Sequence, residues 1–154
     1  MALVVSLPEP VMKHSYGVAE FMAKYAIHHP ALKLDPYEMY TIGLLHDIGK
    51  LYPGDFDPTG KAKYKGHAQK GGNLLYDLGF TCYKEVMHHG HPEHGYYSRK
   101  WLILNLADLS VNSEGKTVRI EDRIAKIKDR YGENSEEYRN AQKMYWILVN
   151  ENMV

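Results

Sequence analysis

Cysteine is almost absent from this sequence of 154 residues, which contains only Cys82. An intramolecular disulfide is therefore impossible, and the chain suits a reducing compartment such as the cytoplasm. A net charge is missing too, since 19 Lys and Arg residues balance 19 Asp and Glu residues. Without an excess of cationic side chains, stable sequence-independent binding to nucleic acid is not expected.

Long apolar runs are also missing. No segment approaches the roughly 18 apolar residues that a membrane-spanning helix needs. Residues 1–7 are apolar but lack the basic start and the length of a signal peptide. With 44% hydrophobic and 25% charged residues, the composition is that of a folded globular domain. We therefore expect a single cytoplasmic domain over residues 1–154, with no membrane partner.

Helical periodicity covers most of the chain, and no convincing strand alternation interrupts it. Local signals predict the helix boundaries, such as Asp35 followed by Pro36 at one start and Ser98 at another. Helices are expected over residues 9–28, 36–49, 67–78, 81–89, 99–111, 118–131 and 135–150. Residues 52–66 are rich in Gly and Pro and predict a loop. The predicted fold is all-α, a compact bundle of six to seven helices.

Histidine is abundant, with nine residues, and several ionisable side chains stand in apolar helical segments, among them the adjacent His46 and Asp47. Asp108 is one example, because its neighbours from Leu102 to Val111 are nearly all apolar. A buried carboxylate costs several kcal/mol unless a positive charge compensates it, either in a polar network or from a metal ion. A divalent cation would compensate all the residues of this kind, which are His14, His46, Asp47, His67, His88, His89 and Asp108.

These donors favour a centre of two divalent transition-metal ions. Imidazole and carboxylate without thiolate suit Fe, Mn, Zn, Co or Ni better than Ca, and iron is the metal expected first. Seven ligands exceed what one ion holds while leaving room for a substrate, whereas two ions about 3.5–4 Å apart can share a carboxylate. His46 and Asp47 point about 100° apart on a helix, which leaves one oxygen of Asp47 to bridge. A single ion, with the other histidines contacting substrate, is the alternative.

Residues 46–50 read His-Asp-Ile-Gly-Lys, and with His14 before and Asp108 after them they resemble the signature of the HD superfamily of metal-dependent phosphohydrolases. His67 and the His88–His89 pair resemble the additional histidines of two-metal members, among them the HD-GYP cyclic-dinucleotide phosphodiesterases and the HD-type diadenosine polyphosphate hydrolases. The resemblance implies an HD-type helical domain that cleaves a phosphoester or phosphoanhydride of a nucleotide-like small molecule. The enzyme would be a phosphomonoesterase, a phosphodiesterase or a dinucleoside polyphosphate hydrolase.

The resemblance also implies a role for each matching residue. One ion would be held by His14, His46, Asp47 and Asp108, and the second by Asp47, His67, His88 and His89. A water bridging the two ions would be the nucleophile, and Lys50 would bind a substrate phosphate. Asp47 and Lys50 are therefore the expected catalytic residues.

The segment after the histidine pair departs from the HD-GYP pattern. Gly90 stands where those domains have Glu, and Tyr97 where they have Pro, which argues against cyclic di-GMP as the substrate. His91, His94 and Arg99 in or after this segment, and Lys65 in the loop before His67, are candidates for binding an anionic substrate, although each also suits a solvated surface.

Two other functions fit the same residues. A mixed-valent di-iron oxygenase, as in the HD-fold myo-inositol oxygenase, would use a similar ligand set, and a degraded HD module would only bind a nucleotide.

The aromatic segment 145–149 predicts packing of the last helix or the face of a homodimer.

Overall fold

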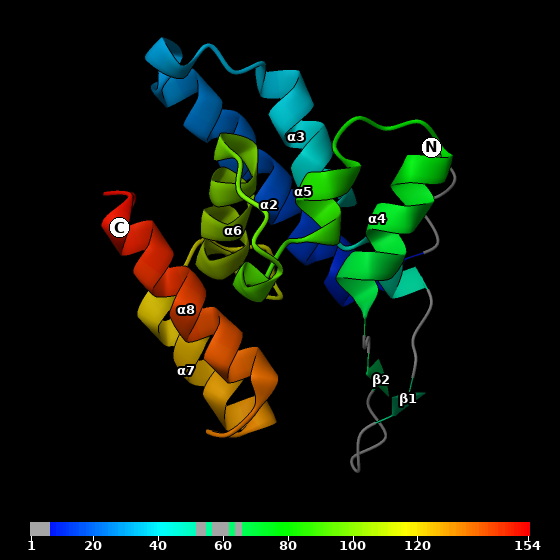
Figure 1. The fold of residues 1–154 in the computed structure, drawn as a ribbon, viewed down its shortest axis with the longest axis vertical. Helices are drawn as coiled ribbons and strands as arrows, with labels where there is room; N and C mark the ends of the chain where they lie inside the picture. Colours follow the sequence, from blue (N-terminus) through cyan, green and yellow to red (C-terminus); the bar gives the residue numbers. More distant parts are fainter. Residues whose placement is uncertain (1–6, 52–54, 57–61, 64–65) are drawn as a thin grey trace.

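A computed structural model describes residues 7–51, 55–56, 62–63 and 66–154, with the backbone alone described at residues 55, 56, 62 and 63. Seven α-helices and three short 3-10 helices account for nearly all the regular structure in these ranges (Figure 1). The elements are α2 (Glu9–His28), η1 (Pro30–Leu32), α3 (Pro36–Leu45), η2 (Ile48–Leu51), β1 (Asp55–Phe56), β2 (Ala62–Lys63), α4 (His67–Asp77), α5 (Tyr83–Met87), η3 (Pro92–His94), α6 (Arg99–Ser110), α7 (Ile120–Tyr131) and α8 (Glu136–Asn150). The predicted all-α helical bundle is confirmed.

Side-chain caps begin three of the helices, and two of the caps, Asp35 and Ser98, are start signals predicted from the sequence. The Asp35 carboxylate accepts a hydrogen bond from the Tyr37 N–H at the start of α3, at 2.9 Å. Ser98 accepts one from the Trp101 N–H at the start of α6, and Ser135 begins α8 in the same way. These bonds satisfy backbone donors that a helix leaves without partners in its first turn.

Two segments differ from the prediction. Helix α3 ends at Leu45 rather than at Gly49, because the backbone tightens into turns whose bonds span three residues, with the Lys50 N–H donating to the Asp47 carbonyl at 2.9 Å. Within the predicted loop, β1 and β2 pair in antiparallel fashion, with Asp55 opposite Lys63. Strands of two residues are too short for an alternating pattern to reveal them.

Helix α6 is the central helix of the bundle. One side of it, including Ile103 and Leu104, packs into a core shared with α2, α3 and α5. The other side, including Leu106, packs into a second core beneath α7 and α8, which run side by side along one edge of the molecule (Figure 1). Because α6 is covered on both sides, Asp108 near its end projects from an almost completely buried helix.

The aromatic segment of α8 is divided between core and surface. Leu148 is fully buried, whereas Trp146 is 62% exposed.

Among the helices of the described ranges, none combines the length and the apolar character needed to cross a membrane.

Candidate metal centre

Asp47 lies at the centre of a buried group of imidazoles. Its side chain, in the turn between α3 and η2, is only 3% exposed. The Oδ2 atom is 3.3 Å from His46 Nε2 and 3.9 Å from His14 Nε2. The Oδ1 atom is 3.4 Å from Nε2 of both His67 and His89. The two oxygens of one carboxylate therefore face two different pairs of imidazoles.

Asp108 adds a second carboxylate to one of these pairs. Its Oδ1 atom lies 2.7 Å from His14 Nε2 and 3.4 Å from His46 Nε2. His14 comes from α2, His46 follows α3 and Asp108 comes from α6, so three segments distant in the sequence meet at this point. We call the six residues His14, His46, Asp47, His67, His89 and Asp108 the buried cluster, although the side chains of His67 and Asp108 at its edge are 30% and 24% exposed.

Three imidazoles of the buried cluster are oriented by the backbone. Nδ1 of His14, His46 and His89 each donates a hydrogen bond to a main-chain carbonyl. The accepting carbonyls belong to Asn112 at 3.1 Å, Gly43 at 2.7 Å and Val86 at 2.5 Å, respectively. A hydrogen bond at Nδ1 directs the lone pair of Nε2 toward the carboxylates, which is the arrangement of a metal-binding histidine and its outer partner.

Two of these Nε2 atoms have no hydrogen-bond partner. Nε2 of His46 and of His89 is buried, and neither makes an aligned hydrogen bond within the described part of the chain. Buried polar atoms without a partner are rare and need an explanation, because each has lost its hydration. Nitrogen and carboxylate lone pairs that converge in this way fit a cation between them.

The pKa values indicate the same excess of negative charge. Burial lowers the pKa of His46, but the carboxylates of Asp47 and Asp108 outweigh it and raise the pKa to about 10. Although burial raises the pKa of Asp47, the charges of His46 and Lys50 hold it well below its ordinary value. Without a metal ion, the two carboxylates are thus balanced by the Lys50 ammonium, 3.2 Å from Asp47 Oδ2, and by a proton on His46. A divalent ion can replace that proton.

His67 occupies its place because η2 packs against the start of α4. A Cβ atom on Gly49 would lie 1.8 Å from the backbone oxygen of His67, so only glycine permits this approach. Burial lowers the pKa of His67, although Asp47 raises it, and the ring is therefore kept as a neutral imidazole that can bind a metal.

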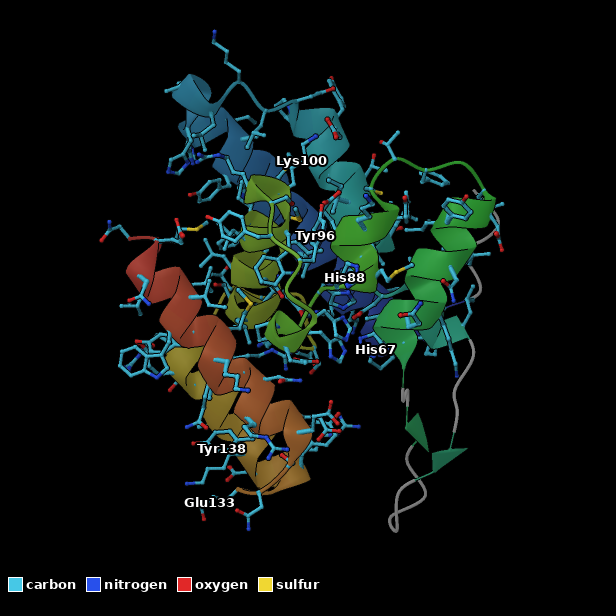
Figure 2. All side chains as sticks on the ribbon, in the orientation of Figure 1. His67, His88, Tyr96, Lys100, Glu133 and Tyr138 are labelled. Atoms are coloured by element: carbon cyan, nitrogen blue, oxygen red, sulfur yellow. The ribbon has the colours of Figure 1, made fainter. Side chains whose placement is uncertain are left out.

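The contacts of the His88 side chain lead to the surface turn and not to Asp47. Its Nδ1 atom lies 3.0 Å from His94 Nδ1, and its ring stacks on Tyr96 with centroids 5.0 Å apart. Figure 2 shows His88 just after the end of α5 and His67 at the first residue of α4. Within the described ranges, no contact joins His88 to Asp47.

The predicted substrate-binding residues have different locations. Lys50 contacts Asp47, whereas His91 and His94 lie in and beside η3 at the surface. Arg99 is exposed at the first residue of α6, so it lies about 14 Å along the helix from Asp108. Figure 2 shows its neighbour Lys100 well away from His67. Lys65 lies outside the described residues.

Two residues near these groups were not predicted from the sequence. Asn105 accepts a hydrogen bond from the Gly90 N–H at 2.7 Å and so anchors the chain directly after His89. Glu93 contacts both His91 and His94, at 2.6 and 3.6 Å. The His-Pro-Glu-His spacing could have indicated Glu93, whereas nothing in the sequence singles out Asn105.

Comparison with known proteins gives one match. The HD domain family matches residues 11–133, which span α2 to α7 and contain the whole buried cluster. Neither a curated protein nor a solved structure matches the chain.

Proposed function

The chain belongs to the HD domain family, and from this membership we propose that it is a metal-dependent phosphohydrolase acting on a nucleotide-like phosphoester or phosphoanhydride. One observation carries the proposal. Asp47 is buried with its two oxygens directed at separate sets of imidazole Nε2 atoms, two of which have no hydrogen-bond partner in the described part of the chain.

The donors suit two divalent ions that share Asp47. His46 has a single available nitrogen, Nε2, because its Nδ1 is bonded to a carbonyl. It can therefore serve one ion, with His14 and Asp108 beside it. His67 and His89 are left for a second ion on the Oδ1 side of Asp47. His88 was predicted as a further ligand of that ion, but its Nδ1 atom is 3.0 Å from His94 Nδ1 in this structure, so we do not assign it to the proposed centre.

Two such ions, when bound, supply an activated water as nucleophile and neutralise charge on phosphoryl oxygens. The chain's own contribution is to hold the ligands in place. The carbonyl bonds of His14, His46 and His89 fix the ring orientation before the metal arrives, which lowers the cost of assembling the site.

Lys50 is the residue suited to the substrate phosphate. Its ammonium lies at the edge of the buried cluster, and the side chain is 24% exposed, so it reaches both Asp47 and solvent. With metal ions bound at Asp47, the attraction between Asp47 and the Lys50 ammonium would be weaker, and the ammonium would then also be able to contact a phosphate oxygen. A fixed cation at that position stabilises the charge that develops during phosphoryl transfer.

The proposal is tested by metal analysis together with a substrate panel. We expect about two divalent ions per chain, and metal-dependent phosphate release from at least one member of a panel of nucleoside phosphates, cyclic nucleotides and diadenosine polyphosphates. The Asp108→Asn variant should lose both metal and activity. Metal-loaded protein that is inert toward the whole panel contradicts the proposal. Substrate-dependent oxygen uptake with a half-reduced di-iron EPR signal would identify an oxygenase instead.

A further inference from the structure

The segment His-Pro-Glu-His at residues 91–94 folds into a rigid turn at the surface. Its 3-10 helix η3 has about three residues per turn, so residues three positions apart lie one above the other. The rings of His91 and His94 accordingly stack with centroids 4.7 Å apart and planes within 5°. Pro92 restricts the backbone of the turn, and Gly95 closes it with a φ of 77°.

The two stacked imidazoles converge on one carboxylate. Glu93 Oε1 is 2.6 Å from His91 Nδ1 and 3.6 Å from His94 Nε2. Donor atoms around a tetrahedral zinc ion lie roughly 3.3–3.5 Å apart, since each bond is about 2.0–2.2 Å long. The three side chains are 30–34% exposed, so small rotations bring the donors to that spacing.

His94 also has the outer partner of a metal ligand. Its Nδ1 is 3.0 Å from His88 Nδ1, and donation of that proton to His88 leaves the Nε2 lone pair for an ion on the side of Glu93. The base of the turn is anchored, because Trp101 Nε1 donates to the His88 carbonyl at 2.9 Å and Asn105 accepts from Gly90. These bonds anchor the backbone that leads into the turn before any ion binds.

We propose that His91, Glu93 and His94 form a surface site for a divalent transition metal such as Zn²⁺, separate from the buried cluster. The carboxylate between the two imidazoles repels a phosphate and attracts a cation, so these residues suit a metal better than direct contact with an anionic substrate. Two nitrogens and one oxygen are a donor set that zinc prefers, and solvent exposure leaves a fourth position for water or another ligand.

Isothermal titration with Zn²⁺ tests the proposal on protein whose buried centre has already been filled. The wild-type protein should bind one further Zn²⁺ per chain. The His91→Ala and Glu93→Gln variants should bind that ion at least roughly tenfold more weakly, because each loses one of three ligands. His28→Ala is the matched control, since it removes an exposed imidazole at the end of α2 and should leave the affinity unchanged.

Two results would overturn the proposal. One is that filled wild-type protein takes up no further zinc, and the other is that a further ion binds equally well to the His91→Ala and Glu93→Gln variants. Metal content of the buried centre, measured by elemental analysis after gel filtration, should be the same in all four proteins. The surface-site result is therefore independent of whether the buried centre hydrolyses phosphoesters.

Discussion

The Asp47→Asn variant is the most direct test of the buried cluster. The substitution removes one negative charge at nearly constant volume. Asp47 contacts imidazoles on both of its oxygens, so the change affects both proposed ions at once. The charge balance changes too, because Asp108 is then the one carboxylate of the cluster beside His14 and His46, and the raised pKa of His46 should fall.

The expected loss of metal affinity follows from the number of ligands involved. Removing an outer-shell partner of a metal ligand costs roughly 10–100-fold in affinity. Asp47 is a direct ligand in the proposed centre, so we expect a loss of more than roughly 100-fold for the weaker ion, or about 2.7 kcal/mol. Without its second ion the centre loses its activated water, and kcat/KM should fall at least roughly a thousandfold, about 4 kcal/mol.

Three assays measure these effects. Elemental analysis after dialysis gives the metal content, and steady-state phosphate release gives kcat/KM. NMR titration of metal-free protein gives the pKa of His46. The exposed Asp129 on α7 offers a matched control, since Asp129→Asn removes the same charge and should change none of them. The reasoning is refuted if Asp47→Asn protein keeps two ions per chain and retains activity within tenfold of the wild type.

Three further predictions follow from the same geometry. Lys50→Met should keep the metal ions but lower kcat/KM by roughly 100-fold and raise KM, and Lys50→Arg should recover part of the activity. Steady-state kinetics equal to those of the wild type would exclude a role for this ammonium. Gly49→Ala places a Cβ atom 1.8 Å from the His67 backbone oxygen. Thermal unfolding should therefore show that the free energy of unfolding falls by about 1–3 kcal/mol, and metal binding should weaken. An unchanged melting temperature would contradict the close approach. The pKa of His46 is raised from 6.5 to about 10, so its proton stabilises the folded metal-free protein below about pH 6.5, and that stability is lost as the pH rises through 10. Melting temperatures measured with chelator should therefore fall between pH 7 and 10, and bound metal should remove this slope, since the ion replaces the proton; a flat profile in chelator would argue against the charge balance.

Much of the fold could be predicted because its signals are local. The caps at Asp35 and Ser98 act within one turn of their own helices, and the structure has both of them where the sequence places them. The two-residue strands and the early end of α3 could not be predicted, since neither leaves a periodic pattern long enough to detect.

The chemistry of the residues by itself determined which buried groups need a compensating positive charge. Asp108 in an apolar helix and the His46–Asp47 pair are costly to bury alone, and that cost is visible without coordinates. Tertiary structure alone decided how they are used. His88 and His89 are adjacent and chemically identical, yet the Val86 carbonyl holds His89 toward Asp47 while His88 turns to His94. Arg99 shares a helix with Asp108 but lies about 14 Å along it. The direction of a side chain and its distance from the site depend on how the helices end and pack. Proximity in the sequence determines neither of them.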